Sequence, residues 1–134
     1  MNIRKATVED VKTLTHKLAR NQKSWATVSH MKNDIMCGYL WLLEDENNIV
    51  ASCAVTPTLY GWQGVKRMTI FNKKNHGKGY AETLLRAITN KSGAEYCITP
   101  WDENKAMIHI AEKCGFQFRY KFMEYWNCYI KNNA

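Results

Sequence analysis

The sequence predicts a mixed α+β protein in which helices pack on a sheet, and three observations carry this prediction. Several segments place apolar residues at helical spacing, and several short runs are rich in β-favouring residues. These segments follow one another in the order strand, helix, helix, three strands, helix, strand, helix and two strands. With 134 residues, 46% of them hydrophobic, the chain is expected to form one domain, residues 1–134, with its own core.

The first part of the chain reads as one strand followed by two helices. Residues 3–6 form a short, apolar-leaning strand. Thr7 and Asp10 have the spacing of a capping box, and apolar residues then recur at helical spacing. A helix is therefore expected over residues 8–21, and a shorter one over residues 29–38.

The middle of the chain contains three predicted strands. Residues 39–43 and 49–55 are separated by the turn-forming residues 45–48, so we expect the two strands to form a hairpin. A third strand is expected over residues 65–72. It leads into a basic loop with two glycines, residues 73–79.

The last part of the chain alternates again between helix and strand. The loop is followed by apolar residues on one helical face, which predicts a helix. Residues 96–99 read as a short buried strand, and residues 103–114 as a helix that Asp102 would cap. Residues 116–130 are rich in aromatic and β-favouring residues and are expected to form a final hairpin. In the helix that follows the loop, the apolar residues are Ala81, Leu84, Leu85 and Ile88.

Charge and composition narrow the classes of function. The net charge of +7 indicates an anionic partner, which could be nucleic acid, an acidic protein or a phosphorylated cofactor. The five cysteines and four histidines lack the spacing of metal ligands, so we expect no metal site. The N-terminus has no apolar stretch of signal-peptide length, so we expect a soluble, cytoplasmic protein without membrane contact. The tryptophans, Trp25 among them, are expected in the core or at its rim.

The most informative segment is residues 74–81, KNHGKGYA, which follows a strand and opens a helix. Gly77 and Gly79 allow the backbone to turn tightly and to approach a ligand closely. The first N–H groups of a helix have no internal partner, and the helix dipole adds positive charge, so this geometry binds pyrophosphate. The dinucleotide-binding pattern does not fit, because its third glycine is missing. The Walker pattern does not fit either, because the sequence lacks its Gly-Lys-Ser/Thr ending. Further positive charge comes from Lys73, Lys74 and Lys78.

This segment resembles the pyrophosphate loop of the GNAT superfamily of N-acetyltransferases, Gln/Arg-x-x-Gly-x-Gly/Ala after a strand. The glycines match as Gly77 and Gly79, and Lys74 stands at the Gln/Arg position. Lysine brings positive charge there but cannot form the same paired hydrogen bonds. A second match is Asn104 followed by the sequence AEKCGF at residues 111–116. The order of elements also resembles that fold along the whole chain, which implies a mixed, mostly antiparallel sheet flanked by helices.

The resemblance implies that acetyl-CoA is the co-substrate and that an amine of a small molecule or protein accepts the acetyl group. The strand at residues 68–70 would pair with the pantetheine arm, the loop amides would hold the pyrophosphate, and Asn104 would contact the arm. The strands ending near Thr69 and Thr99 would diverge to admit the thioester. The implied cofactor-binding residues are Met68, Thr69, Ile70, Lys74, Asn75, His76, Gly77, Lys78, Gly79, Tyr80 and Asn104.

The catalytic groups depart from the family pattern. Many members protonate the leaving thiolate with a tyrosine four residues before the glycine of the Gly-Phe pair, and here that position is Ala111. Tyr80 is a candidate replacement, beside Tyr120 and Tyr125. Glu124 is the candidate base, because it alternates with apolar residues along the predicted last strand, where burial would raise the pKa of a carboxyl. The alternative is that this position faces solvent.

A second class of function stays open. A basic module with the same fold, which contacts nucleic acid or a protein and transfers no acetyl group efficiently, would also carry this charge. The sequence has no recognised nucleic-acid-binding motif, and part of its charge lies in the phosphate loop, so nucleic acid is not the favoured partner. The sequence permits a homodimer and does not identify the acceptor amine.

Overall fold

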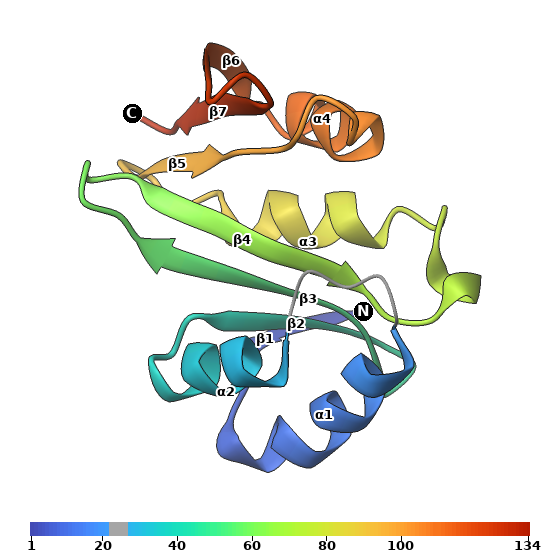
Figure 1. Ribbon diagram of the computed structural model, residues 1–134. Helices are drawn as coiled ribbons and strands as arrows, with labels where there is room; N and C mark the ends of the chain where they lie inside the picture. Colours follow the sequence, from blue (N-terminus) through green and yellow to red (C-terminus); the bar gives the residue numbers. More distant parts are fainter. Residues whose placement is uncertain (22–26) are drawn as a thin grey trace.

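The computed structural model describes residues 1–21 and 27–134 of the chain; Trp25 lies outside these residues. In this part of the chain, seven strands form one sheet in the order β1-β2-β3-β4-β5-β7-β6, with helices packed against it (Figure 1). Neighbouring strands are antiparallel, except that β4 and β5 are parallel. The predicted mixed α+β class is therefore confirmed. The strands are β1 (Asn2–Lys5), β2 (Leu40–Asp45), β3 (Asn48–Pro57), β4 (Gln63–Ile70), β5 (Glu95–Ile98), β6 (Gln117–Phe122) and β7 (Trp126–Asn132). The helices are α1 (Val11–Arg20), α2 (Val28–Met36), α3 (Tyr80–Ile88) and α4 (Lys105–Lys113), with 3-10 turns η1 (Val8–Asp10) and η2 (Lys73–Asn75).

The helices cover both faces of the sheet. Leu42 packs with residues of α1 and α2, whereas the next residue, Leu43, packs with residues of α3 and α4. Successive side chains of a strand point to opposite faces, so the two pairs of helices lie on opposite sides of the sheet. Figure 1 shows α1 and α2 below β1, β2 and β3, with α3 on the other side.

Two local signals in the sequence act as expected. The Thr7 amide donates to the Asp10 carboxylate over 2.7 Å, which completes the capping box, and the helix then starts with one 3-10 turn before α1. The turn between β2 and β3 consists of Glu46 and Asn47, both in the left-handed region with φ of 52° and 65°. Two such residues match the twist of a tight hairpin, so the predicted hairpin is confirmed.

The predicted cap of the last helix is wrong by two residues. Asn104, rather than Asp102, precedes α4, and its side-chain oxygen accepts a hydrogen bond from the Met107 amide over 3.2 Å. The Asp102 carboxylate instead accepts from Lys121 and Asn127 of the last hairpin, over 2.8 and 2.7 Å. These contacts across the fold compete with capping, and the sequence around Asp102 does not reveal them. Among the described residues, no helix combines the length and the apolar character needed to cross a membrane.

Candidate functional site

A cleft opens in the sheet between β4 and β5. The two strands pair only at Gln63 with Tyr96 and at Gly64 with Cys97, and beyond these pairs they diverge. The opening has a volume of about 910 Å³, and it exposes the edge of β4 that β5 no longer covers. The strands thus separate where the resemblance implies. The lining residues are Val65, Lys66, Arg67, Met68, Ile98, Thr99, Pro100, Trp101, Glu103, Asn104, Met107 and Trp126.

A β-bulge shapes the β4 wall of the cleft. Lys66 lies opposite Ala54 and Thr69 lies opposite Ser52, so two β4 residues, Arg67 and Met68, face one β3 residue. Arg67 is in the left-handed region, with φ of 56°, which is unfavourable for a residue with a side chain. A bulge of this kind bends the strand and changes the direction in which its peptide groups point. The bulge therefore lies at the part of β4 that lines the cleft, at Arg67 and Met68.

An ion pair with α2 holds this bulge. The Arg67 guanidinium donates to both carboxylate oxygens of Asp34 over 2.7, 2.8 and 3.1 Å, and the Asp34 side chain is only 3% exposed. Short charge-assisted bonds in a buried setting offset the strain at Arg67. The residue patterns of the sequence did not predict this pair. The signal for it lies in α2, where Asp34 shares a buried face with Met31 and Ile35, because a carboxylate on an apolar helix face requires a partner.

The loop between β4 and α3 turns through two left-handed glycines. Gly77 and Gly79 have φ of 78° and 79°, and a Cβ built on either would meet nothing within 4 Å, so the space in front of the loop is open. In the first turn of α3, the Thr83 N–H donates to the Gly79 carbonyl over 3.0 Å. In the described structure, the amides of residues 77–79 have no acceptor, and the Tyr80 amide follows them at the helix start. These N–H groups are available to an anion.

Asn75 plays a different part from the one predicted. The Asn75 amide donates to Asn72, and the His76 amide to Lys73, within the 3-10 turn η2. The Asn75 side chain is buried and donates to the Phe71 carbonyl over 2.6 Å, which fastens the loop to the end of β4. The expectation that the Asn75 amide is free for pyrophosphate is therefore wrong. The exposed residues of the loop, Lys73, Lys74, His76 and Lys78, remain free to approach a ligand.

Aromatic side chains form the wall opposite β4. Trp101 and Trp126 both line the cleft and meet edge-to-face, with ring centroids 5.0 Å apart. Phe122 stacks on Trp126 from the next strand, β6. Asn104 lies at the same wall, where its side-chain oxygen is used as the helix cap while its amide nitrogen stays available. This wall gives the cleft an apolar side that favours hydrocarbon or cationic groups.

The structure does not support Tyr80 as a catalytic residue. Tyr80 is 8% exposed and packs in the core between the sheet and α3. Its hydroxyl donates to Asp45 at the end of β2 over 2.5 Å, and this hydrogen bond raises the pKa of Tyr80. The side chain does not line the cleft between β4 and β5. The prediction failed because the first residue of a helix can turn its side chain inward while its amide points outward.

A Tyr80→Phe variant tests this structural role. The variant is expected to change kcat and KM of the acetyl transfer that the resemblance implies by less than about twofold, because the hydroxyl lies outside the cleft between β4 and β5. The midpoint of thermal unfolding is expected to fall, because Asp45 loses its hydrogen-bond donor. A large loss of kcat in a folded Tyr80→Phe protein would restore Tyr80 as a catalytic residue.

The prediction that Glu124 lies on the apolar face of the last strand is wrong. β7 begins at Trp126, and Glu124 occupies the turn before it with φ of 65°, exposed to solvent. Met123 shares this left-handed turn, with φ of 50°, so the alternation read from the sequence breaks at the turn. Without an apolar surrounding, the argument for Glu124 as a base no longer holds. The family tyrosine position, Ala111, is fully buried in the core, and no tyrosine is among the residues described as lining the cleft.

Comparison with known proteins identifies the fold. No protein-family model and no curated protein sequence matches the chain. Among solved structures, an acetyltransferase of the GNAT family from Bacillus cereus is similar with a TM-score of 0.81 and 16% identity, over 99% of this chain and 97% of that one. The ribosomal-protein-S18-alanine N-acetyltransferase from Escherichia coli is similar with a TM-score of 0.77 and 14% identity, over 99% and 94%.

A third similar structure contains ligands. It is a spermidine N-acetyltransferase from Vibrio cholerae in complex with CoA and spermine, with a TM-score of 0.75 and 14% identity, over 98% of this chain and 95% of that one. All three solved structures are acetyltransferases, and the match extends over nearly the whole of each chain. The diverging β4 and β5 strands and the glycine loop before α3 are thus parts of the GNAT acetyltransferase fold, and that is the fold of this chain.

Proposed function

We propose that this protein transfers the acetyl group of acetyl-CoA to an amine of a small molecule or protein. The observation that carries the proposal is that one strand joins both parts of the site. β4 lines the cleft at residues 65–68 and leads directly into the glycine loop at residues 73–79. A ligand with an extended arm and a pyrophosphate can occupy both at once. The CoA bound in the similar Vibrio cholerae structure supports this choice of ligand.

Each part of the ligand has a matching group in the chain. The amides of residues 77–80 and the dipole of α3 suit the pyrophosphate, and Lys74 and Lys78 add positive charge. The pantetheine arm would lie along the open edge of β4 at Met68, Thr69 and Ile70. From the opposite wall, the side-chain amide of Asn104 would donate a hydrogen bond to it. The acetyl carbonyl would then lie near the Met68 amide.

The reaction forms a C–N bond and breaks a C–S bond. A neutral amine attacks the carbonyl carbon of the thioester. The amide of Met68, which lies in the bulge of β4, would stabilise the developing oxyanion. The amine gives up one proton to a base, and the CoA thiolate leaves and takes a proton from water. The Lys66 cation lines the cleft and favours the thiolate electrostatically, whereas the charge of Arg67 is paired with Asp34.

Glu103 is our candidate for the base. It carries the one carboxylate among the residues described as lining the cleft, and it stands at the start of the wall that leads into α4. A carboxylate here attracts the ammonium form of the acceptor and can receive its proton directly or through water. The sequence alone did not distinguish Glu103 from the other acidic residues.

A Glu103→Gln variant is expected to lower kcat/KM for acetyl transfer about 100-fold, because the amine loses its proton acceptor. Glu124→Gln is the matched control, since it removes the same charge from the exposed turn between β6 and β7 and is expected to leave the rate unchanged. Release of the CoA thiol, followed with a thiol reagent, measures both. Equal rates in the two variants would exclude Glu103 as the base.

The proposal itself is tested by two measurements on the wild-type protein. Calorimetric titration with acetyl-CoA is expected to show saturable binding, and incubation with a panel of polyamines, amino-sugars and peptides with free N-termini is expected to release thiol with at least one of them. A folded protein that does not bind acetyl-CoA would contradict the proposal. Binding without thiol release for any amine would reduce it to a cofactor-binding module.

A further inference from the structure

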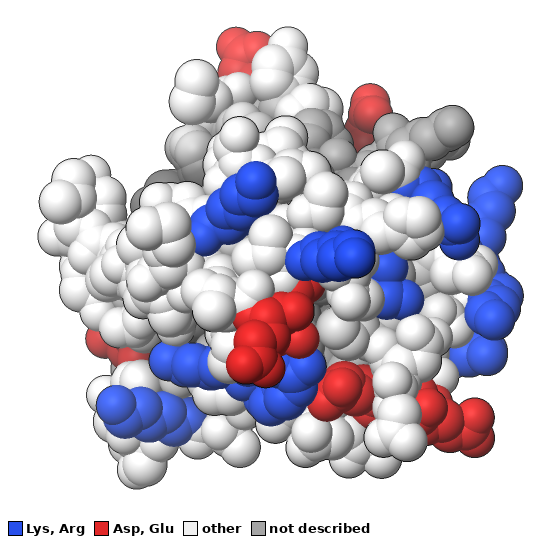
Figure 2. Space-filling view, turned by 90° about the horizontal axis from the view of Figure 1, so that it is seen from below, with Lys and Arg blue, Asp and Glu red and all other residues white. Residues whose placement is uncertain are grey.

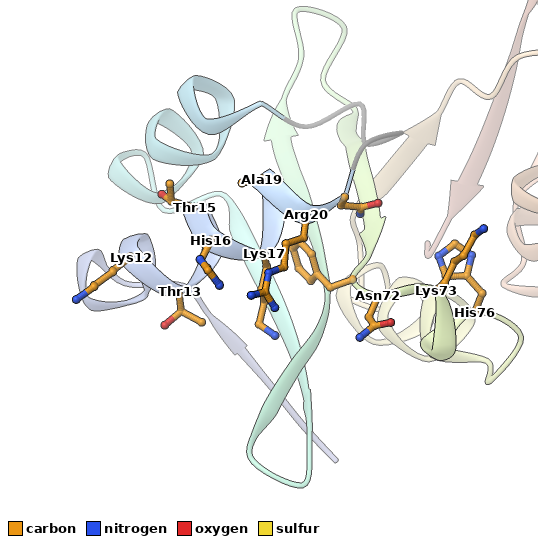
Figure 3. A pocket seen from close by; sticks show the side chains of 12 residues that line it. Lys12, Thr13, Thr15, His16, Lys17, Ala19, Arg20, Asn72, Lys73 and His76 are labelled. Atoms are coloured by element: carbon orange, nitrogen blue, oxygen red, sulfur yellow. The ribbon is translucent and has the colours of Figure 1, made fainter.

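A second concave surface lies beside the phosphate loop, on the other side of the sheet from α3. We call it the α1 groove. It runs between the outer face of α1 and the segment that follows β4, and its volume is about 1160 Å³ (Figure 3). In Figure 3 Arg20 lies on the side of α1 toward Asn72, whereas Lys12 lies at the far end of the helix and points away from Asn72 and Lys73. The lining residues are Lys12, Thr13, Thr15, His16, Lys17, Ala19, Arg20, Asn21, Phe71, Asn72, Lys73 and His76.

Cations line the α1 groove, and none of its described lining residues carries a carboxylate. Four lysine or arginine side chains and two histidines contribute. Burial, and then the charges of Arg20 and of the nearby Lys74, lower the pKa of Lys17. Figure 2, which views the molecule from the side of α1 and α2, shows Lys and Arg side chains gathered along the right-hand edge, where the loop lies. Like charges held together in this way are stabilised by an anionic partner.

The two walls of the groove are fixed to one another. Asn21, at the end of α1, donates from its side chain to the Ile70 carbonyl at the end of β4 over 3.2 Å. Lys17 donates to the side-chain oxygen of Asn48 over 3.1 Å. The side chain of Asn72 accepts from the Lys74 amide over 3.2 Å and fixes the loop wall. The cations are therefore presented by a preformed surface.

The form of the groove suits an extended anion. Lys12, His16 and Arg20 follow one another at intervals of four residues, so they lie on one stripe of α1 and span about 12 Å along its axis. Lys73 adds a charge from the opposite wall. A single phosphate would contact only part of this row, whereas a chain of phosphates could contact all of it.

The lining chemistry favours nucleic acid over an acidic protein. Protein interfaces depend on exposed aromatic or apolar anchors, and in this groove the apolar residues are Ala19 and Phe71, of which Phe71 is 2% exposed. Contacts to a nucleic-acid backbone require only lysine, arginine, threonine and asparagine side chains, which the groove has. Among the described lining residues, the exposed rings are the imidazoles of His16 and His76, and no phenylalanine, tyrosine or tryptophan ring is exposed there for a base to stack on.

We propose that the α1 groove binds the phosphate backbone of a nucleic acid without reading its bases. The inference goes beyond the proposed acetyl transfer, because the groove lies outside the cleft between β4 and β5 and requires no acetyl-CoA. Binding is therefore expected to be insensitive to base sequence and to weaken steeply as salt is added.

The test uses fluorescence anisotropy of short labelled DNA duplexes and RNA strands of mixed sequence. The variant Lys12→Glu/Arg20→Glu reverses two exposed charges of the groove, and Lys91→Glu/Arg119→Glu reverses one lysine and one arginine that are exposed elsewhere. The groove variant is expected to bind at least about tenfold more weakly, with the slope of log K against log salt reduced by about 2. The control variant is expected to bind like the wild type, apart from a small loss of affinity for every probe that follows from its lower net charge.

Calorimetry with acetyl-CoA on the same variants separates this inference from the proposed function. The groove variant is expected to bind acetyl-CoA like the wild type. The inference would be overturned if the wild type binds neither DNA nor RNA, or if the two variants lose the same amount of affinity for nucleic acid. Binding of polyglutamate as tight as that of nucleic acid would also overturn it. It would also be overturned if the groove variant loses acetyl-CoA, since the groove would then belong to the cofactor.

Discussion

A Gly79→Glu variant is expected to lose binding of acetyl-CoA, with Kd raised at least about 100-fold. Gly79 stands at the end of the loop with φ of 79°, next to the first amides of α3. A glutamate there places a carboxylate in front of these amides, where it repels the pyrophosphate and competes for the same N–H groups. Calorimetric titration with acetyl-CoA measures the effect directly.

The chain offers a matched control for this variant. Gly93 also has φ of 79°, and a Cβ there also meets nothing within 4 Å, but it lies in the turn between α3 and β5. Gly93→Glu thus introduces the same backbone strain and the same charge at a different place. It is expected to bind acetyl-CoA like the wild type. If both variants bind acetyl-CoA equally well, the glycine loop is not the pyrophosphate site.

An Asp34→Ala variant is expected to lower the free energy of unfolding by about 3 kcal/mol, because Arg67 loses its partner in a largely buried position. The side chains of Asp34 and Arg67 are 3% and 20% exposed, so water replaces the lost bonds poorly. The midpoint of thermal unfolding is expected to fall by roughly 10 °C, which calorimetry or circular dichroism measures. A change of only one or two degrees would mean that the pair contributes little.

A second variant separates stability from the position of the bulge. Asp34→Leu/Arg67→Met replaces both charges by apolar side chains and is expected to recover much of the lost stability. The kcat of the proposed acetyl transfer is expected to be well below that of the wild type in this double variant, because nothing then holds the left-handed backbone of Arg67 beside the proposed oxyanion donor. Full activity in this double variant would show that the bulge forms without the ion pair.

The position of the candidate base shows how a strand pattern can mislead. Glu124 alternates with apolar residues toward the end of the chain, yet the turn between β6 and β7 includes it, and the strand begins only at Trp126. Met123 and Glu124 have left-handed backbone conformations although neither is glycine or asparagine, so the sequence gives no signal of this turn. The sequence did not single out Glu103, because Glu103 lines a cleft that exists only where β4 and β5 diverge.

The sequence by itself determined the order of helices and strands, the hairpin between β2 and β3, and the glycine loop before α3. Each of these depends on neighbours within a few residues: the spacing of apolar side chains, a capping pair, or two glycines ahead of a helix. Such local preferences act before the chain is folded, so they can be read without knowing the fold.

Only the tertiary structure decided which side chains reach the site. Arg67 and Asp34 are 33 residues apart in the sequence, and the Tyr80 hydroxyl meets Asp45 across 35 residues. The α1 groove joins a helix near the N-terminus to a loop in the middle of the chain. These contacts form because two layers of helices pack on opposite faces of one sheet. Their partners are fixed by burial and charge pairing in the folded protein, which no local pattern encodes.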